Sequence, residues 1–117
     1  MNAYDKGNEL ARALKDSDEY RMLGKARREL DTDPAARDMV KDFLRKQMEM
    51  QLEVMSGKAD AKSKQESLQK LYELLSLNSR ARDYVMAYMR FQQVMQDIYK
   101  MIGDAVGEGL DPFADKK

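Results

Sequence analysis

Hydrophobic residues recur at alternating intervals of three and four residues from Asn78 to Gly107, which is the spacing of one stripe along a helix. We expect a single helix of about 28 residues, about 42 Å long at 1.5 Å per residue. A compact globule of this chain length has a diameter of only about 35 Å. The helix should therefore protrude or cross between subunits. Its stripe consists of Ala81, Tyr84, Tyr88, Phe91, Met95, Ile98, Ile102 and Ala105.

This helix carries more hydrophobic residues than one buried face accounts for. Val85, Tyr99 and Val106 widen the stripe, and other apolar side chains lie on different sides. Burying one face would leave much apolar surface in water, so the pattern predicts a second partner, with a homodimer as the leading hypothesis. Methionine adapts to irregular binding surfaces. The residues predicted for this interface are Met86, Met89, Val94, Met101 and Ile102.

Four shorter helices precede the long one. The pattern predicts them over Ala3 to Lys15, from Ser17 to Leu30, from Pro34 to about Ser56 and from about Asp60 to Ser76. Ser17, Asp33 and Asn78 are expected as N-caps, because their side chains accept hydrogen bonds from amide groups that the first turn leaves free. Pro34 suits the first helical position, and Gly57 suits a C-terminal cap. The result is an all-α fold of about five helices.

An internal repeat relates the two long helices. A shift of 45 residues aligns Asp33 with Asn78 and the segment RDMV, from Arg37, with RDYV, from Arg82. Each half reads as a short helix, a capped turn and a longer helix. Neither hairpin can close a core alone, so we expect the two to pack on each other as a bundle, about a pseudo-twofold axis.

Composition restricts the chemistry. The 117 residues contain no Cys and no His, which removes disulfides, zinc sites of the usual ligand set and the commonest general base. The formal net charge is zero, so no overall field attracts nucleic acid or acidic lipid. No signal peptide or membrane span is visible, and a cytoplasmic protein is expected. We expect a single helical domain over residues 1–109 and a flexible tail over 110–117.

Acidic pairs one helical turn apart are the nearest approach to a metal or acid–base site. These are Asp38 with Asp42 and Glu49 with Glu53. Basic neighbours at helical spacing and the lack of histidine favour solvated ion pairs, so no catalytic, metal or cofactor residue is predicted. A second alternative is a phosphate-contacting patch at the helix starts, although solvated surface is the default for such residues. The basic residues of this patch are Lys25, Arg27, Arg28, Arg80 and Arg82.

Three stretches resemble the YlbF/YmcA/YheA family of small helical bacterial proteins, and the YheA branch most closely. They are NAYDKGNELARALKDSDEY, LYELLSLNSRARDY and VMAYMRFQQVMQDIYKMI. The resemblance implies a self-associating helical bundle with no catalytic residues. It also implies relatives in a regulatory complex, linked to RNA processing and to developmental decisions in Gram-positive bacteria. Some relatives bind iron–sulfur clusters through cysteines, which this chain lacks.

Together these observations predict a non-enzymatic adaptor or regulatory interaction module, homodimeric through its long Met-rich helices, with a protein partner that the residues do not identify. An RNA-associated factor using the basic residues is the alternative, and an enzyme is the third and weakest class. The sequence names neither the process regulated nor any small ligand.

Overall fold

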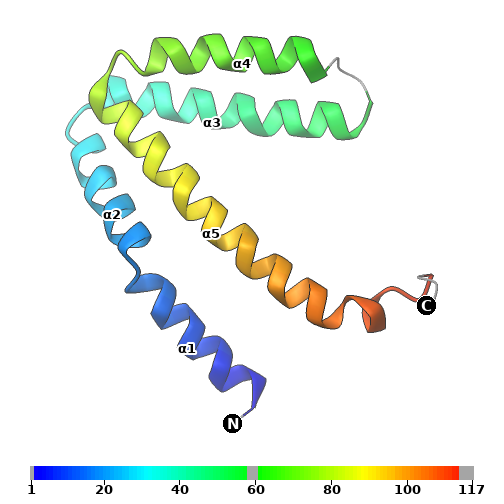
Figure 1. Cartoon of the computed structure of the whole chain (residues 1–117). Coiled ribbons are helices and arrows are strands. Elements are labelled where there is room, and N and C mark those ends of the chain that lie inside the picture. The colour runs from blue at the N-terminus through cyan, green and yellow to red at the C-terminus, as the bar shows by residue number, and fades with distance from the viewer. Residues whose placement is uncertain (1, 58–60, 114–117) are drawn as a thin grey trace.

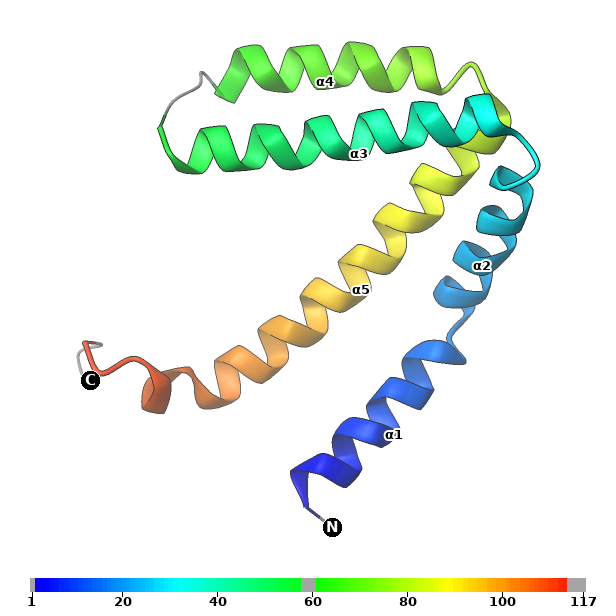
Figure 2. The same ribbon diagram turned by 180° about the vertical axis from the view of Figure 1, so that it is seen from behind.

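The computed structural model describes residues 2–57 and 61–113, and every secondary-structure element in that part of the chain is a helix. The all-α prediction is confirmed, and Figures 1 and 2 show the arrangement from two opposite sides. The helices are α1 (Ala3–Lys15), α2 (Asp18–Leu30), α3 (Pro34–Met55), α4 (Ala61–Leu75) and α5 (Ser79–Leu110).

The helix boundaries follow from the caps that the sequence offers. The side chains of Ser17, Asp33 and Asn78 each accept a hydrogen bond from the backbone amide three residues ahead, as predicted. Gly57, just past the end of α3, has a φ of 74°, a left-handed conformation that costs glycine little. The predicted start of α4 at Asp60 lies outside the described residues.

The long helix α5 extends further than predicted. We expected the helix to end near Gly107, but it continues through Gly107 and Gly109 to Leu110. Each glycine weakens a helix by about 1 kcal/mol relative to alanine, which does not end a helix that already has many turns. Leu110, assigned by the sequence to a flexible tail, is therefore the last residue of α5.

Each short helix packs mainly on the long helix of the other half. Helix α2 runs along α5, and α4 runs along α3, while α3 and α5 separate from a common corner like the arms of a V. Tyr20 of α2 contacts Phe91 of α5, with ring centroids 5.2 Å apart. The molecule measures 49 × 39 × 16 Å with a radius of gyration of 18.1 Å. A compact chain of this length has about 13 Å, so the fold is open and flat.

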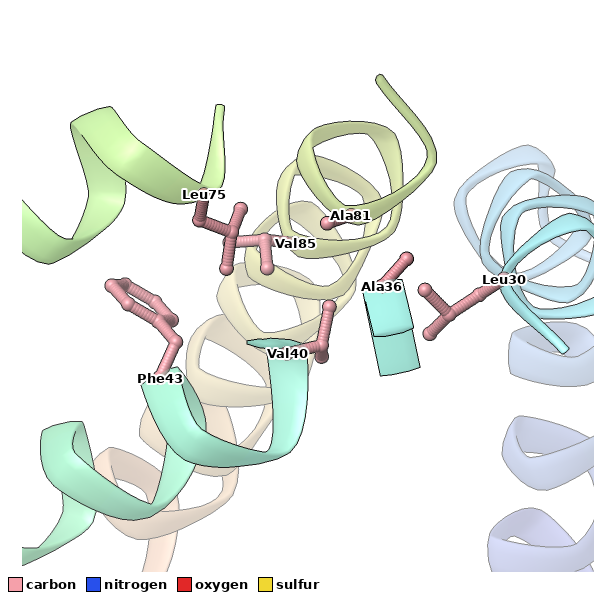
Figure 3. Close-up of a cluster of buried hydrophobic side chains, with 7 residues drawn as sticks. All are labelled: Leu30, Ala36, Val40, Phe43, Leu75, Ala81 and Val85. Carbon is pink, nitrogen blue, oxygen red and sulfur yellow. The ribbon is translucent and has the colours of Figure 1, made fainter. Parts of the chain in front are cut away.

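The core occupies the corner of the V, and it is built from positions related by the sequence repeat (Figure 3). Ala36 and Ala81 are fully buried, and their small side chains allow α3 and α5 to approach closely. The caps also meet, because Asn78 Nδ2 donates to Asp33 Oδ2 over 3.4 Å. The buried cluster contains Leu30, Ala36, Val40, Phe43, Leu75, Ala81 and Val85.

Replacing Asn78 with alanine should lower the free energy of unfolding by about 1 kcal/mol, because the first turn of α5 then loses its cap. Asn78→Ser keeps a side-chain acceptor for the Ala81 amide and should recover most of that loss. Urea unfolding followed by circular dichroism measures both variants. Equal stability of Asn78→Ala and the native chain would contradict the capping role.

Candidate functional site

The structure distributes the five predicted interface residues over different surfaces. Met86 and Met89 face α3 and α4 across a groove, and Met89 also packs against the core. Val94 is half-buried in a hollow beside Met22 of α2. Met101 and Ile102 lie far from the corner and are largely exposed. The residues therefore do not form one continuous patch within a single chain.

The distal half of α5, residues 96–110, presents an uncovered apolar face. At 3.6 residues per turn, Lys100 and Asp104 occupy one side of this segment, where they form an ion pair of 2.8 Å. The opposite side carries Ile102 and Val106, with Tyr99 and Leu110 along one edge and Met101 along the other, and at least 48% of each of these side chains is exposed.

Sequence reasoning identified only part of this face. It expected most of the main stripe of α5 to be buried within the chain, so apart from Ile102 it selected residues off that stripe, such as Met86 and Val94. In the structure α2 covers only the first half of α5, and α1 contains no buried residue. The signal that could have identified the uncovered distal half was length, because a helix of about 42 Å is much longer than the short helices that precede it.

A groove opens where α3 and α4 separate from α5. It has a volume of about 980 Å³, and its lining is predominantly apolar. Helices α3 and α4 form its floor, and α5 forms one wall. Sequence reasoning missed it, because its existence depends on the angle between α3 and α5. The groove residues are Phe43, Gln47, Met50, Gln51, Val54, Met55, Gln65, Leu68, Gln69, Tyr72, Val85, Met86, Met89 and Arg90.

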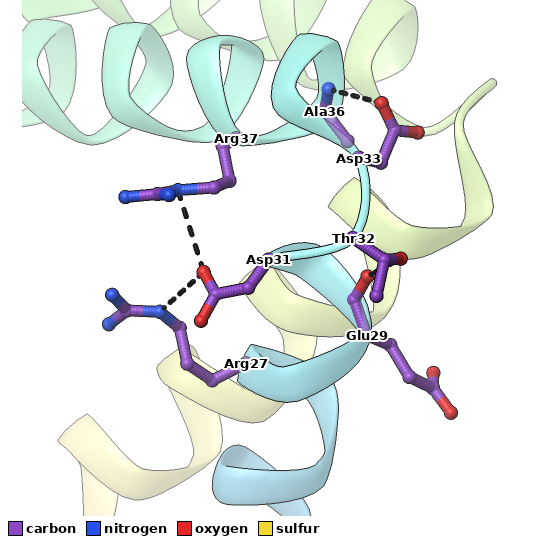
Figure 4. Close-up of polar contacts among 7 residues, drawn as sticks. All are labelled: Arg27, Glu29, Asp31, Thr32, Asp33, Ala36 and Arg37. Carbon is purple, nitrogen blue, oxygen red and sulfur yellow. Dashed lines mark hydrogen bonds and ion pairs between the residues drawn. The ribbon is translucent and has the colours of Figure 1, made fainter.

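Of the predicted phosphate-contacting residues of α2, Arg27 lies beside a carboxylate (Figure 4). Arg27 Nε donates to Asp31 Oδ1 over 3.0 Å, and Arg37 approaches the same oxygen at 3.5 Å. The bond to Asp31 raises the pKa of Arg27. Lys25 borders a hollow that also contains Glu29, and Arg28 forms no ion pair within the described parts of the chain.

The basic residues of α5 have similar surroundings. Arg82 lies 3.3 Å from the carboxylate of Asp83, and Arg80 lies 4.0 Å from that of Asp33. The sequence predicted that the basic residues of α2 and those of α5 could lie side by side, and α2 does run along α5. Their charges are nevertheless largely balanced locally, so the electrostatic attraction for a phosphate chain is weak.

One carboxylate of each acidic pair of α3 forms an ion pair with a lysine. Asp42 binds Lys46 at 3.1 Å, and Glu53 binds Lys64 of α4 at 3.1 Å. In the described segments no three His, Cys, Asp or Glu side chains are grouped to hold a metal ion. None of the buried side chains described is polar or charged.

Polar contacts to Asp33 join the start of α3 to the start of α5. The Ala36 amide and the Asn78 side chain both donate to Asp33, which lowers the pKa of this carboxyl below 3.8. Burial raises the pKa of Tyr84, and the charge of nearby Arg27 partly opposes that rise.

The lowered pKa of Asp33 predicts a specific acid sensitivity. The ionised cap contributes its full stability above the ordinary pKa of 3.8, and this contribution disappears as the pH falls through the lower folded-state value. Asp33→Asn retains an N-cap without a titrating group. Its unfolding midpoint in urea should therefore fall less than that of the native chain between pH 5 and about pH 2.5. If the unfolding midpoints of the two proteins fell equally over this pH range, the stabilising role of the ionised Asp33 carboxylate would be contradicted.

Comparison with known proteins finds a family of similar sequences. The sequence model described as "Control of competence regulator ComK, YlbF/YmcA" matches residues 3–107. A UPF0342 protein of Symbiobacterium thermophilum is 44% identical over 94% of this chain and 97% of its own length. One from Caldicellulosiruptor bescii is 36% identical over 98% of both chains, and one from Desulfitobacterium hafniense is 37% identical over 91% and 86%.

None of the helices in the described residues is both long and apolar enough to cross a membrane. The YheA branch stays a prediction, since the names of these relatives do not distinguish branches. The match of the family model over residues 3–107 and the similarity to the UPF0342 proteins over nearly their whole length show that the chain belongs to the YlbF/YmcA family.

Proposed function

We propose that this chain is a non-enzymatic regulatory interaction module that works as a homodimer. The observation that carries the proposal is the amount of surface that the single chain exposes. Its solvent-accessible area is 9310 Å². A compact monomer of 13.6 kDa exposes about 6,600 Å².

The difference of about 2,700 Å² per chain exceeds the roughly 800 Å² that each partner buries in a standard complex, and it is comparable to the upper end of what each partner buries in an obligate dimer, about 1,000–2,500 Å². Eight of the eighteen exposed large hydrophobic side chains among the described residues lie on the distal half of α5 or in the groove. A second copy that covers both would remove these side chains from water. Association of this kind also leaves the outer faces of α1 and α4 free for another protein.

A regulatory role fits this surface better than catalysis does. The family is described by its control of the competence regulator ComK, which is an action on another protein. The features of this chain that could recognise a partner are extended helix faces instead of an enclosed cavity with titratable groups. We therefore propose that the dimer acts by presenting these faces to a protein partner.

The RNA-associated alternative has less support, because carboxylates accompany Arg27, Arg80 and Arg82. Capture of the tagged chain from an extract of its own cells, with and without ribonuclease, separates the two functions. The adaptor proposal predicts the same specific proteins in both samples. Loss of those proteins after ribonuclease treatment would move the assignment to RNA.

A further inference from the structure

The groove and the distal half of α5 are complementary surfaces that one chain cannot bring together. Helix α5 is continuous from Ser79 to Leu110, so its distal half cannot fold back onto the floor formed by α3 and α4. The proximal half of α5 already forms one wall of that groove. From this constraint, and resting on the proposed homodimer, we infer that the distal half of α5 from a second copy occupies the groove, reciprocally in both copies.

The dimensions of the two surfaces agree. On α3 the groove extends from Phe43 to Met55, thirteen residues whose twelve steps span about 18 Å of helix. The apolar face of the distal half extends from Ile98 to Leu110, which also spans about 18 Å. One segment of helix therefore fills the length of the floor, and the face turned toward the floor is the apolar one.

The charges of the two surfaces are complementary as well. Among the described residues that line the groove, Arg90 is the only charged one, and no ion pair within 4 Å joins it to a described carboxylate, although it also borders hollows beside α2 that contain acidic residues. Residues 96–110 contain three carboxylates and one lysine, a net charge of −2. The net charges of the segment and of the groove are therefore opposite in sign, so the two surfaces do not repel each other.

The polar groups of the groove indicate that it is incomplete in one chain. The side-chain amide of Gln47 donates to the sulfur of Met89 at 4.0 Å, and a thioether is a weak acceptor. Gln51, Gln65 and Gln69 also border the opening. An inserted helix covers the methionines beside these amides.

The arrangement buries both uncovered surfaces of each chain in a single symmetric interface. Each copy contributes one groove and one distal helix, so the interface is isologous and closes at two chains. A partner that covered only one of the two surfaces would leave the other exposed. A second copy supplies both complementary parts with the same apolar character, which is why we assign the groove to it and not to a different protein.

Chemical cross-linking tests this arrangement directly, because the native chain has no cysteine and introduced thiols are the only ones present. The test variant carries Gln51→Cys in the groove and Ile102→Cys on the distal half, both at exposed positions. A short bis-maleimide should convert most of it to a covalent dimer. The matched control carries Lys41→Cys, on the part of α3 that faces Arg27 and Tyr84, together with Ile102→Cys.

The control pair, and Ile102→Cys alone, should remain mostly uncross-linked. Circular dichroism verifies that each variant keeps its helical content, and light scattering before reaction gives its mass. A dimeric mass with equal cross-linking of test and control would overturn the groove assignment and leave the homodimer standing. A monomeric mass for native chain and variants alike would overturn both.

Discussion

Replacing Phe43 with alanine should destabilise the protein by about 3–5 kcal/mol, the usual cost of removing a buried phenylalanine ring. Phe43 is 3% exposed and its ring centroid lies 5.8 Å from that of Tyr72, so the side chain joins α3 to α4. A domain of this size has a total free energy of unfolding of only about 5–15 kcal/mol. The variant should therefore be partly or largely unfolded at room temperature.

The chain provides a matched control for this substitution. Phe113 is 90% exposed, and Phe113→Ala should change the free energy of unfolding by less than about 0.5 kcal/mol. Both variants are compared by urea unfolding at one fixed chain concentration, since the stability of a dimer depends on concentration. A Phe43→Ala protein as stable as the control would show that the corner of the V is not the main core.

The double substitution of Ile102→Glu and Val106→Glu should convert the proposed dimer to a monomer. Both side chains belong to the exposed apolar face of the distal half of α5, and two carboxylates buried there would lose their hydration without gaining partners. Truncating central interface residues commonly weakens binding by 2 kcal/mol or more, about thirtyfold. The mass is measured by size-exclusion chromatography with light scattering.

The control for this pair lies on the polar side of the same segment. Gln96→Glu together with Lys100→Gln changes the net charge by the same −2 and leaves the apolar face intact. It should keep the dimeric mass. If the distal-face variant remained dimeric while retaining its helical content, the distal half of α5 would not be the association surface.

The sequence predicted the local structure well, because local structure depends on residues near one another in the chain. Ser17, Asp33 and Asn78 were identified as caps from their own side chains, and the structure confirms all three. The repeat identified Ala36 and Ala81 as equivalent positions, and both are fully buried at the crossing of α3 and α5.

The candidate surfaces were less accessible to sequence reasoning. Periodicity shows which side chains share a face of α5, but it does not show where a neighbouring helix ends. Tyr99 and Val106 were therefore assigned to a widened core stripe, although they are 65% and 48% exposed. The groove depends on the angle between α3 and α5, and no local pattern encodes that angle.

The central claim is that the native chain is a homodimer, and sedimentation equilibrium over a wide range of concentrations tests it most directly. We predict a mass of twice 13.6 kDa that persists to low micromolar concentration. A mass of 13.6 kDa at every concentration would contradict the account, because the distal half of α5 and the groove would then remain exposed in the functional protein.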